Sequence, residues 1–472
     1  MDYIKGRDRN QIQIMQSLDE MVDKNNVTRI IDVFVENLDL KALKFSKSVI
    51  KETGRPPYNP KDMLKLYIYG MENGITSSRK LERECGRNIE LMWLINEIKP
   101  ESSTICEFRK ENSKPLVNMF RTFCRMLKDW DLIDGKVMAL DGTKIRANNS
   151  KKNNFSLNKL ERSIAYIVEK IAKYMEEIDR NDIEEAKIPK LNTEKVIQKI
   201  QDLKSRKERY NTLINTIESG EVKEVSTTDP DSRLMSNNNG VEVSYNVQAM
   251  VDSKNKLVAG ISVINNSADA GQLGIIPKDV KENLEISEMT VLADKGYYKT
   301  EDFKKCEEEN ITTIVSKPKE TNNINVEFQK KDFKFNPQTN TFTCPNNCIL
   351  FPTKADKDGF RRYKNNRACK QCPIIHKCTT GKRKELCRHI NADGAERNNE
   401  RHDQNLDLYK QRQMLIEHPF GTIKRTMGIR QFQTRGITNV TGEVALIFTT
   451  YNLKRLKNLL GIDKVIAKMM EN

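Results

Sequence analysis

Apolar residues recur at helical spacing in the first quarter of the chain. They do so from Ile30 to Leu38 and from Met63 to Met71, and Gly and Pro fall mainly between such stretches. Shorter runs, with Arg and Lys near Ser or Thr, cover 77–82, 89–94 and 102–109. We therefore expect residues 1–130 to be helical. The short helices would suit a helix-turn-helix module on DNA, although many all-α domains share this pattern.

Two long amphipathic runs lie between residues 151 and 220. Apolar residues keep a three-four alternation over 157–178 and again over 200–217, after a break at Pro189. This pattern predicts an antiparallel helical hairpin or a short coiled coil inserted in a larger domain. We interpret it as a packing element with solvated charged faces. Binding of DNA or of a second protomer is the alternative.

The period changes to two after residue 221. Residues 241–250 alternate, residues 257–264 continue the alternation, and the turn formers between them predict a β-hairpin. The segments that follow are a helix-like 268–284, a strand at 289–293, a helix at 299–309, a strand at 311–315 and a polar loop at 316–340. Strands that first pair and then alternate with helices predict an α/β protein with a mixed sheet.

The charge balance points to a polyanionic partner. Lys and Arg number 81 against 66 Asp and Glu, a net charge of +15, and nucleic acid is the usual partner of so basic a chain. A generally Lys-rich, soluble surface is the plainer explanation. No stretch approaches the roughly 20 apolar residues that cross a bilayer. Residues 1–10 lack the apolar run of a secretory signal, so we expect a cytoplasmic protein without membrane contact.

Three carboxylates stand in settings that suit a metal-dependent nuclease. Asp141 ends the apolar run 137–140 and precedes Gly142, and Asp294 ends the run 289–293. A carboxylate at the end of a buried strand, beside a Gly turn, is a natural ligand of Mg²⁺ or Mn²⁺. An aspartate there is more often a turn former or a helix cap, so the argument rests on the set.

The third member is Glu417, in a basic segment that we expect to be helical. Lys424 lies two turns further along the same face, where it could touch a phosphate next to the metal. Pro419 predicts a kink, or a helix that restarts there. Glu396 and Glu400 compete for the acidic role but lie in a stretch that looks less regular.

The cysteines are expected to bind metal. Ten cysteines in a cytosolic protein would stay reduced, and six of them fall within 344–387. We expect a structural Zn²⁺ that staples a small insertion, with Cys344, Cys369, Cys372 and Cys378 as ligands. The substitutes are Cys348, His376, Cys387 and His389.

Taken together, the chain resembles the DDE transposases of bacterial insertion sequences over nearly its full length. The resemblance rests on Leu140-Asp141-Gly142-Thr143, on Ala293-Asp294-Lys295-Gly296-Tyr297 and on 417–425, which begins Glu417-His418-Pro419-Phe420-Gly421. Many relatives read Tyr, two residues, Arg, three residues, Glu, six residues, Lys. Here four residues separate Arg412 from Glu417, one more than that pattern, whereas the Glu417 to Lys424 spacing holds.

The resemblance implies a ribonuclease-H-like core that cuts transposon ends and joins them to target DNA. Asp141, Asp294 and Glu417 would hold two Mg²⁺ or Mn²⁺ ions. DNA would be positioned by Lys144, Arg146, Arg412, Lys424 and Arg425. Lys295 and Tyr297 would support the second aspartate. The partner would be double-stranded DNA, bound by a homodimer. A DNA-binding regulator without catalysis and a nuclease without strand transfer are the alternatives.

These expectations divide the chain into five parts. They are a helical DNA-binding domain at 1–130, the core at 131–150 and 221–340, the helical hairpin at 151–220, the cysteine-rich insertion at 341–390, and the end of the core with the third acid and C-terminal helices at 391–472.

Overall fold

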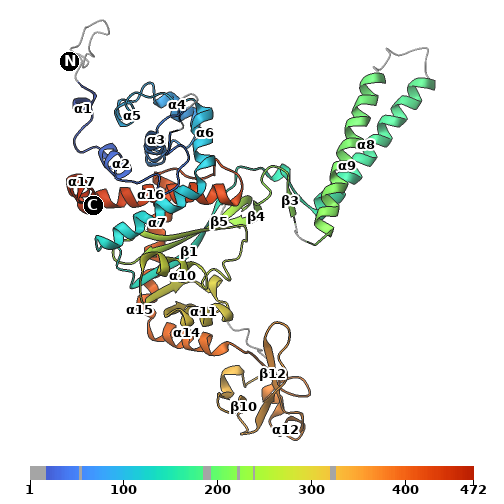
Figure 1. Cartoon of the computed structure of the whole chain (residues 1–472). Helices are drawn as coiled ribbons and strands as arrows, with labels where there is room; N and C mark the ends of the chain where they lie inside the picture. The colour runs from blue at the N-terminus through green and yellow to red at the C-terminus, as the bar shows by residue number, and fades with distance from the viewer. Residues whose placement is uncertain are drawn as a thin grey trace, which may run out of the picture.

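The computed structural model describes residues 17–50, 52, 56–183, 193–220, 224–237, 240–318 and 326–471. Figure 1 shows a body in which helices surround a sheet. A long two-helix arm and a small lobe built on strands extend from this body. The mixed α/β class expected from the sequence is confirmed. In the described chain, no helix is long and apolar enough to cross a membrane.

The body begins with a group of helices. They are α1 (Leu18–Met21), α2 (Val27–Glu36), α3 (Pro60–Glu72), α4 (Ser78–Glu84), α5 (Ile89–Leu94), α6 (Ser102–Glu111) and α7 (Ser113–Asp129). Asparagine side chains cap α2 and α3, because Asn26 accepts a hydrogen bond from the Thr28 amide and Asn59 accepts one from the Lys61 amide. The helices expected at 30–38 and 63–71 are thus confirmed as α2 and α3.

The central sheet has six strands. They are β1 (Val137–Arg146), β4 (Arg233–Asn237), β5 (Gly240–Asp252), β6 (Val258–Ile264), β7 (Met289–Ala293) and β8 (Ile311–Val315). The strand order is β4-β5-β1-β7-β8. β6 is not part of this path and pairs with β5. β1 and β6 run antiparallel to β5, whereas β7 and β8 are parallel to β1. The β5–β6 pair confirms the expected β-hairpin.

The remaining helices of the body are α10 (Ile276–Leu284), α11 (Thr300–Glu308), α14 (Ala392–Gln404), α15 (Leu406–Gly421), α16 (Ile437–Leu460) and α17 (Ile462–Met470). They pack on this sheet, except α17, which packs on α2 and α16. α15 contacts β1, β5 and β7, and α16 passes between the N-terminal helices and β6 (Figure 1). α16 is buried on all sides from Gly442 to Leu453, including the polar residues Glu443 and Asn452. One hydrophobic core therefore joins the N-terminal helices to the sheet.

The arm is formed by α8 (Leu157–Ile183) and α9 (Thr193–Glu218), which confirms the two helices expected there. The break at Pro189 lies outside the described residues. At the base of the arm, β2 (Asn154–Ser156) pairs with β3 (Glu224–Ser226). The arm has a small core of its own around Phe155 and Tyr210, and it projects away from the body in Figure 1.

The cysteine-rich lobe is a five-stranded antiparallel sheet with two short helices. Its elements are β9 (Lys334–Asn336), β10 (Thr341–Thr343), β11 (Ile349–Pro352), β12 (Phe360–Lys364), α12 (Asn366–Lys370), α13 (Ile375–Cys378) and β13 (Leu386–His389). It has a separate core that includes Phe342 and Tyr363. β9 lies inside the segment expected to be a loop, part of which, 319–325, is outside the described residues.

Two expectations about helices are wrong. The helix expected from Ala268 begins only at Ile276. Two glycines precede it, and one of them, Gly271, has φ +94°, which does not fit a helix. Pro277 then favours the first turn of a helix at this point. Residues 268–275 are therefore a loop. The stretch around Glu396 and Glu400, which looked irregular, is the regular helix α14.

Candidate active site

Asp141 lies on β1, and Asp294 directly follows the neighbouring strand β7. β1 and β7 are parallel, and their register pairs Leu140 with Ala293, so the two aspartates are the next residues on each strand path. Neighbouring strands are about 4.8 Å apart. The first and second acids, which are 153 residues apart in sequence, thus lie at neighbouring positions of the fold.

Asp141 is held at both oxygens. Its Oδ1 accepts a hydrogen bond from the Gly142 amide at 2.7 Å, and its Oδ2 forms an ion pair with Arg412 Nη1 at 3.0 Å. Burial raises the pKa of Asp141; the Gly142 amide and Arg412 oppose this effect, and the charges of Asp294 and Asp269 add to it. Three carboxylates therefore act on one another here.

Gly142 is not the turn residue that we expected. β1 continues through it to Arg146, and a Cβ at Gly142 would lie 2.3 Å from Gln248 Nε2 and 2.8 Å from Asn246 Oδ1. Glycine is needed because side chains from β5 approach the backbone at this point. The Gly that follows the first acid thus makes room for buried polar groups.

Asp294 caps the short helical turn η2 (Lys295–Tyr297). Its Oδ1 accepts a hydrogen bond from the Gly296 amide at 2.7 Å, which leaves its Oδ2 for other partners. Tyr297 was expected to support Asp294. Instead, its buried hydroxyl donates to Gln248 Oε1. Lys295 is exposed.

Glu417 lies on α15, the helix that also carries Arg412. Its Oε1 accepts a hydrogen bond from Gln413 Nε2 at 2.6 Å, and the residue is exposed. No described contact joins it to Asp141 or Asp294. The helix therefore runs past the two aspartates, but the structure leaves the third acid turned towards solvent.

The expected break at Pro419 takes a different form. α15 continues through Pro419 to Gly421 and then widens into a π-helical turn, η4 (Thr422–Thr426). Such turns are frequent at functional sites. This one carries Lys424, whose Nζ donates to Thr143 Oγ1 on β1. Arg412 and Lys424 thus reach β1 on either side of Glu417.

The five residues expected to bind DNA lie on β1, on α15 and on the π turn η4. Burial lowers the pKa of Lys424, and the neighbouring charge of Lys144 lowers it further. Arg146 is half-exposed, and its Nε lies 3.3 Å from Glu242 Oε1. Arg425 is exposed on the π turn. Arg412 is the exception, because it is engaged with Asp141.

One acid of the site was missed. Asp269 lies in the loop before α10, and its Oδ1 accepts hydrogen bonds from Asn246 Nδ2 and Gln248 Nε2, both at 2.7 Å. The apolar pattern of 268–284 instead predicts a helix for this stretch. The available signal was the Gly271 and Gly274 pair, which makes a loop more favourable than a helix there.

Five cysteines line one small cavity of the lobe. Cys344, Cys369, Cys372 and Cys378 are the four expected ligands, and Cys348 joins them. The cavity holds ≈ 20 Å³, about the room of a single water. The Cys348 amide donates to Cys344 Sγ at 3.3 Å, and Asn346 Nδ2 donates to Cys372 Sγ at 3.6 Å.

The other substitutes are placed elsewhere. Cys387 is exposed on β13, and His389 Nε2 pairs with Glu301 Oε1 at 2.9 Å. His376 does not line the cysteine cavity. Over the described residues as a whole, no three His, Cys, Asp or Glu side chains have the spacing of a metal-ligand set.

Comparison with known proteins covers most of the chain. Residues 134–453 match the family described as Transposase DDE domain, and residues 16–111 match the family described as Transposase domain (DUF772). No curated protein sequence matches the chain. Among solved structures, a piggyBac transposase synaptic complex with hairpin DNA aligns over 95% of this chain and 79% of its own, at 10% identity and a TM-score of 0.32. The match over 134–453, more than half of the chain, shows that the protein belongs to the DDE transposases, enzymes of DNA transposition.

Proposed function

We propose that this transposase cleaves DNA at the ends of an insertion sequence and joins those ends to target DNA, with Asp141, Asp294 and Glu417 as its catalytic acids. The observation that carries the proposal is the pairing of β1 with β7, which sets Asp141 beside Asp294. The strand arrangement, with β6, β5 and β1 antiparallel and β7 and β8 parallel to β1, supports a ribonuclease-H-like core.

The donor set fits a divalent cation of the Mg²⁺ type. Carboxylate oxygens are the ligands that Mg²⁺ and Mn²⁺ prefer. The Arg412 guanidinium at Asp141 Oδ2 supports this fit, because the site already attracts one cation. When bound, two such ions activate the attacking hydroxyl and stabilise the leaving oxygen of a phosphodiester.

The chain's own residues position the acids and the DNA. The Gly142 amide fixes Asp141 Oδ1, and the Gly296 amide fixes Asp294 Oδ1, so the other oxygen of each carboxylate faces incoming ligands. Arg412 must release Asp141 Oδ2 for that oxygen to bind an ion. Glu417 completes the set once its bond to Gln413 is exchanged.

Basic residues around the acids bind the phosphates. Lys144 and Lys424 lie next to each other, and Arg146 and Arg425 follow them closely in sequence, so the backbone of a bound strand would meet positive charge beside the carboxylates. The helices of 1–130 would contribute further contacts to double-stranded DNA. We keep the five-part domain division as part of this proposal.

A structural Zn²⁺ in the lobe is the second part of the proposal. Thiolates suit tetrahedral Zn²⁺, and the cavity offers five sulfurs where four are needed. Cys344, Cys369 and Cys372 are near both Cys348 and Cys378, whose pKa values are raised by burial and by these neighbouring thiols. The fourth ligand is therefore Cys348 or Cys378.

The deciding experiment uses labelled insertion-sequence end DNA with Mg²⁺. Wild type should cut and join it, and Asp141→Ala, Asp294→Ala and Glu417→Ala should each lose both products. Glu400→Ala, which removes an exposed acid from α14, is the control and should remain active. Cuts without joining would favour a nuclease, and binding without either would favour a regulator.

A further inference from the structure

Asp269 stands between the two motif glycines of the active site. Its Oδ1 lies 2.9 Å from the position of a Cβ at Gly142, and its Oδ2 lies 3.4 Å from that of a Cβ at Gly296. These glycines follow Asp141 and Asp294 closely in sequence. The loop between β6 and α10 thus delivers a fourth carboxylate to the same place.

A buried network fixes this carboxylate. Asn246 and Gln248 are fully buried on β5, and each donates an amide hydrogen bond to Asp269 Oδ1. The Tyr297 hydroxyl donates to Gln248 Oε1, so the amide nitrogen of Gln248 must face Asp269. Gln248 Nε2 also donates to Asn246 Oδ1 at 3.1 Å, which links the two amides.

The network leaves one oxygen of Asp269 available. Both amides end on Oδ1, and none of the described hydrogen bonds ends on Oδ2. The side chain does not stabilise its own loop, as an aspartate in an Asx turn would. Its partners are instead on β5. Three buried polar side chains are thus used to orient one carboxylate towards the site.

We propose that Asp269 is a fourth acid of the transposase site and that its Oδ2 binds the divalent ion held by Asp141 and Asp294. The proposal rests on the function proposed above. Asn246, Gln248 and Tyr297 are positioning residues in it, because they act through Asp269. The Tyr297 of the Asp-Lys-Gly-Tyr motif thereby gains a role that links the second acid to this one.

The test is Asp269→Asn, studied by calorimetric titration with Mg²⁺. Asparagine keeps the Oδ1 acceptor for both amides and replaces Oδ2 with an amide group, so the network survives and the charge is lost. We expect at least a tenfold loss of Mg²⁺ affinity and loss of cleavage, with an unchanged circular dichroism spectrum. Asp407→Asn, at an exposed position of α15, should bind Mg²⁺ as wild type does.

A second variant keeps the proposal testable if Asp269→Asn does not fold. Tyr297→Phe removes only the hydroxyl that orients Gln248, and it should weaken Mg²⁺ binding by a smaller factor. If either variant binds Mg²⁺ as tightly as wild type, while wild type cuts end DNA, the role of Asp269 is overturned and the proposed function is not. A wild type that neither binds Mg²⁺ nor cuts end DNA would overturn the proposed function instead.

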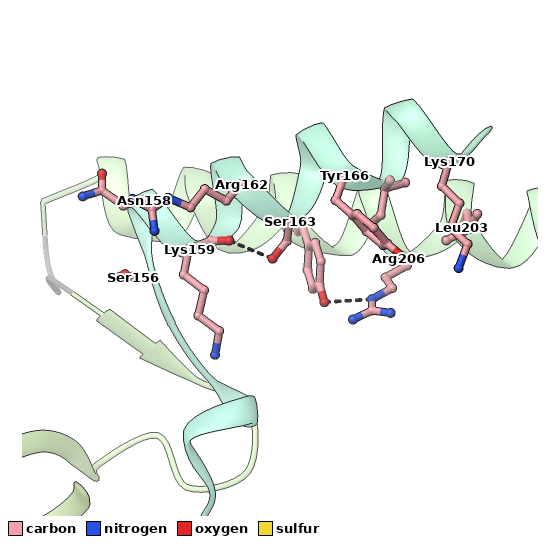
Figure 2. Close-up of a pocket in the computed structure, with 11 residues that line it drawn as sticks. Ser156, Asn158, Lys159, Arg162, Ser163, Tyr166, Lys170, Leu203 and Arg206 are labelled. Atoms are coloured by element: carbon pink, nitrogen blue, oxygen red, sulfur yellow. Dashed lines mark hydrogen bonds between the residues drawn. The ribbon is translucent and has the colours of Figure 1, made fainter. Parts of the chain in front are cut away.

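A separate observation concerns the arm. A cavity of ≈ 470 Å³ lies on it, formed by the base of α8 and the facing part of α9 (Figure 2). Its lining includes the cations Lys159, Arg162, Lys170 and Arg206 and no acidic residue. Tyr166, which is 60% exposed, adds an aromatic face.

Most of this positive charge has no acidic partner among the described residues of the arm. Lys159 is occupied, because its Nζ donates to three backbone carbonyls, two of which belong to Lys151 and Asn154. The described ion pairs include none with Arg162, Lys170 or Arg206. Arg206 Nε donates to the Tyr210 hydroxyl, a bond visible in Figure 2, which leaves its terminal nitrogens for a ligand.

We infer that this face of the arm binds the sugar-phosphate backbone of DNA, away from the carboxylates. Arginine and lysine without acidic neighbours suit phosphates, and an exposed tyrosine packs against sugars or bases. This inference also rests on the proposed function. It replaces our view of the arm as a plain packing element.

The test compares two triple variants in binding to a labelled random-sequence duplex over a range of salt. Replacing Arg162, Lys170 and Arg206 by Gln should lower affinity and reduce the salt slope by about two to three. Replacing Lys173, Lys204 and Arg209, three cations of the arm outside the cavity, is the matched control.

The inference is overturned if both triples bind like wild type, or if both lose the same affinity. Loss of affinity only for an acidic protein partner, with DNA binding unchanged, would also overturn it. If wild type itself fails to bind the duplex, the proposed function falls before the arm is in question.

Discussion

At the scale of single residues, the acids of the site depend on polar groups that are buried beneath them. Gly142 shows this most clearly, because its missing side chain admits Gln248 and Asn246 next to Asp141. Asp252 is a second buried acid, at the far end of β5, where it accepts hydrogen bonds from the amides of Gly135 and Lys254. Each of these residues leads to a prediction.

Gly142→Ala should damage both fold and activity. The new Cβ would overlap Gln248 Nε2, and overpacking of a buried site costs about 1–3 kcal/mol of unfolding free energy. Denaturant unfolding measures that loss. Gly421→Ala is the matched control, because no atom lies within 4 Å of its added Cβ. Equal stability of the two variants would contradict the close approach at Gly142.

Asp252 should make stability depend on pH. Burial raises the pKa of its carboxyl to about 6, above the value of about 3.9 in an unfolded chain. The stabilisation is therefore complete below about pH 4 and is lost as pH rises through 6. Two pKa units correspond to about 3 kcal/mol. Between pH 4 and 7, unfolding free energy should fall more for wild type than for Asp252→Asn; parallel profiles would contradict this.

At the scale of elements, the sequence predicts strands and helices better than it predicts what they bring together. The apolar runs before Asp141 and Asp294 predicted that each acid follows a buried strand, and the parallel pairing of β1 with β7 is what brings the two acids together. Arg412 was placed in doubt by its spacing, yet it contacts Asp141. Spacing along a helix does not reveal which strand the helix will cover.

Asp269 was beyond the reach of the same reasoning. Its loop was mistaken for a helix, because apolar residues at Leu273 and Ile276 imitate helical spacing. Its partners Asn246 and Gln248 lie on β5 and are buried polar residues in a strand that reads as an ordinary alternation. Asn246 and Gln248 reach the site because the sheet register pairs Gly142 with Gln248, and the sequence does not reveal this register.

The lobe leads to a prediction about metal. If four thiolates hold Zn²⁺, the purified chain should contain one equivalent by atomic absorption, and a strong chelator should unfold the lobe while the body keeps its own transition. Cys348→Ser and Cys378→Ser distinguish the fourth ligand, since only one should lose the metal. Cys387→Ser, at an exposed site outside the cavity, is the control. Absence of zinc from wild type would contradict the site.

At the scale of the whole molecule, positive charge is distributed over parts that lie far apart. The net charge of +15 includes residues around the acids on the body and residues on the projecting arm (Figure 1). Contacts at both places would hold a long stretch of DNA. The single core that joins the N-terminal helices to the sheet would then carry bound DNA and active site as one unit.

The assembly on DNA should be a dimer, because two ends must be joined. Light scattering with insertion-sequence end DNA should give the mass of two chains with two duplexes. A duplex of scrambled sequence serves as the control and should give no such species. A single chain per complex at every protein concentration would contradict the dimer without affecting the assignment of the acids.

The central claim is that Asp141 and Asp294 jointly hold a divalent cation. Anomalous diffraction from crystals soaked in Mn²⁺ tests it most directly. We predict a peak about 2.1 Å from a carboxylate oxygen of each aspartate, with Arg412 moved away from Asp141 Oδ2. A density map with Arg412 still on Asp141, and manganese bound only elsewhere on the chain, would contradict the account.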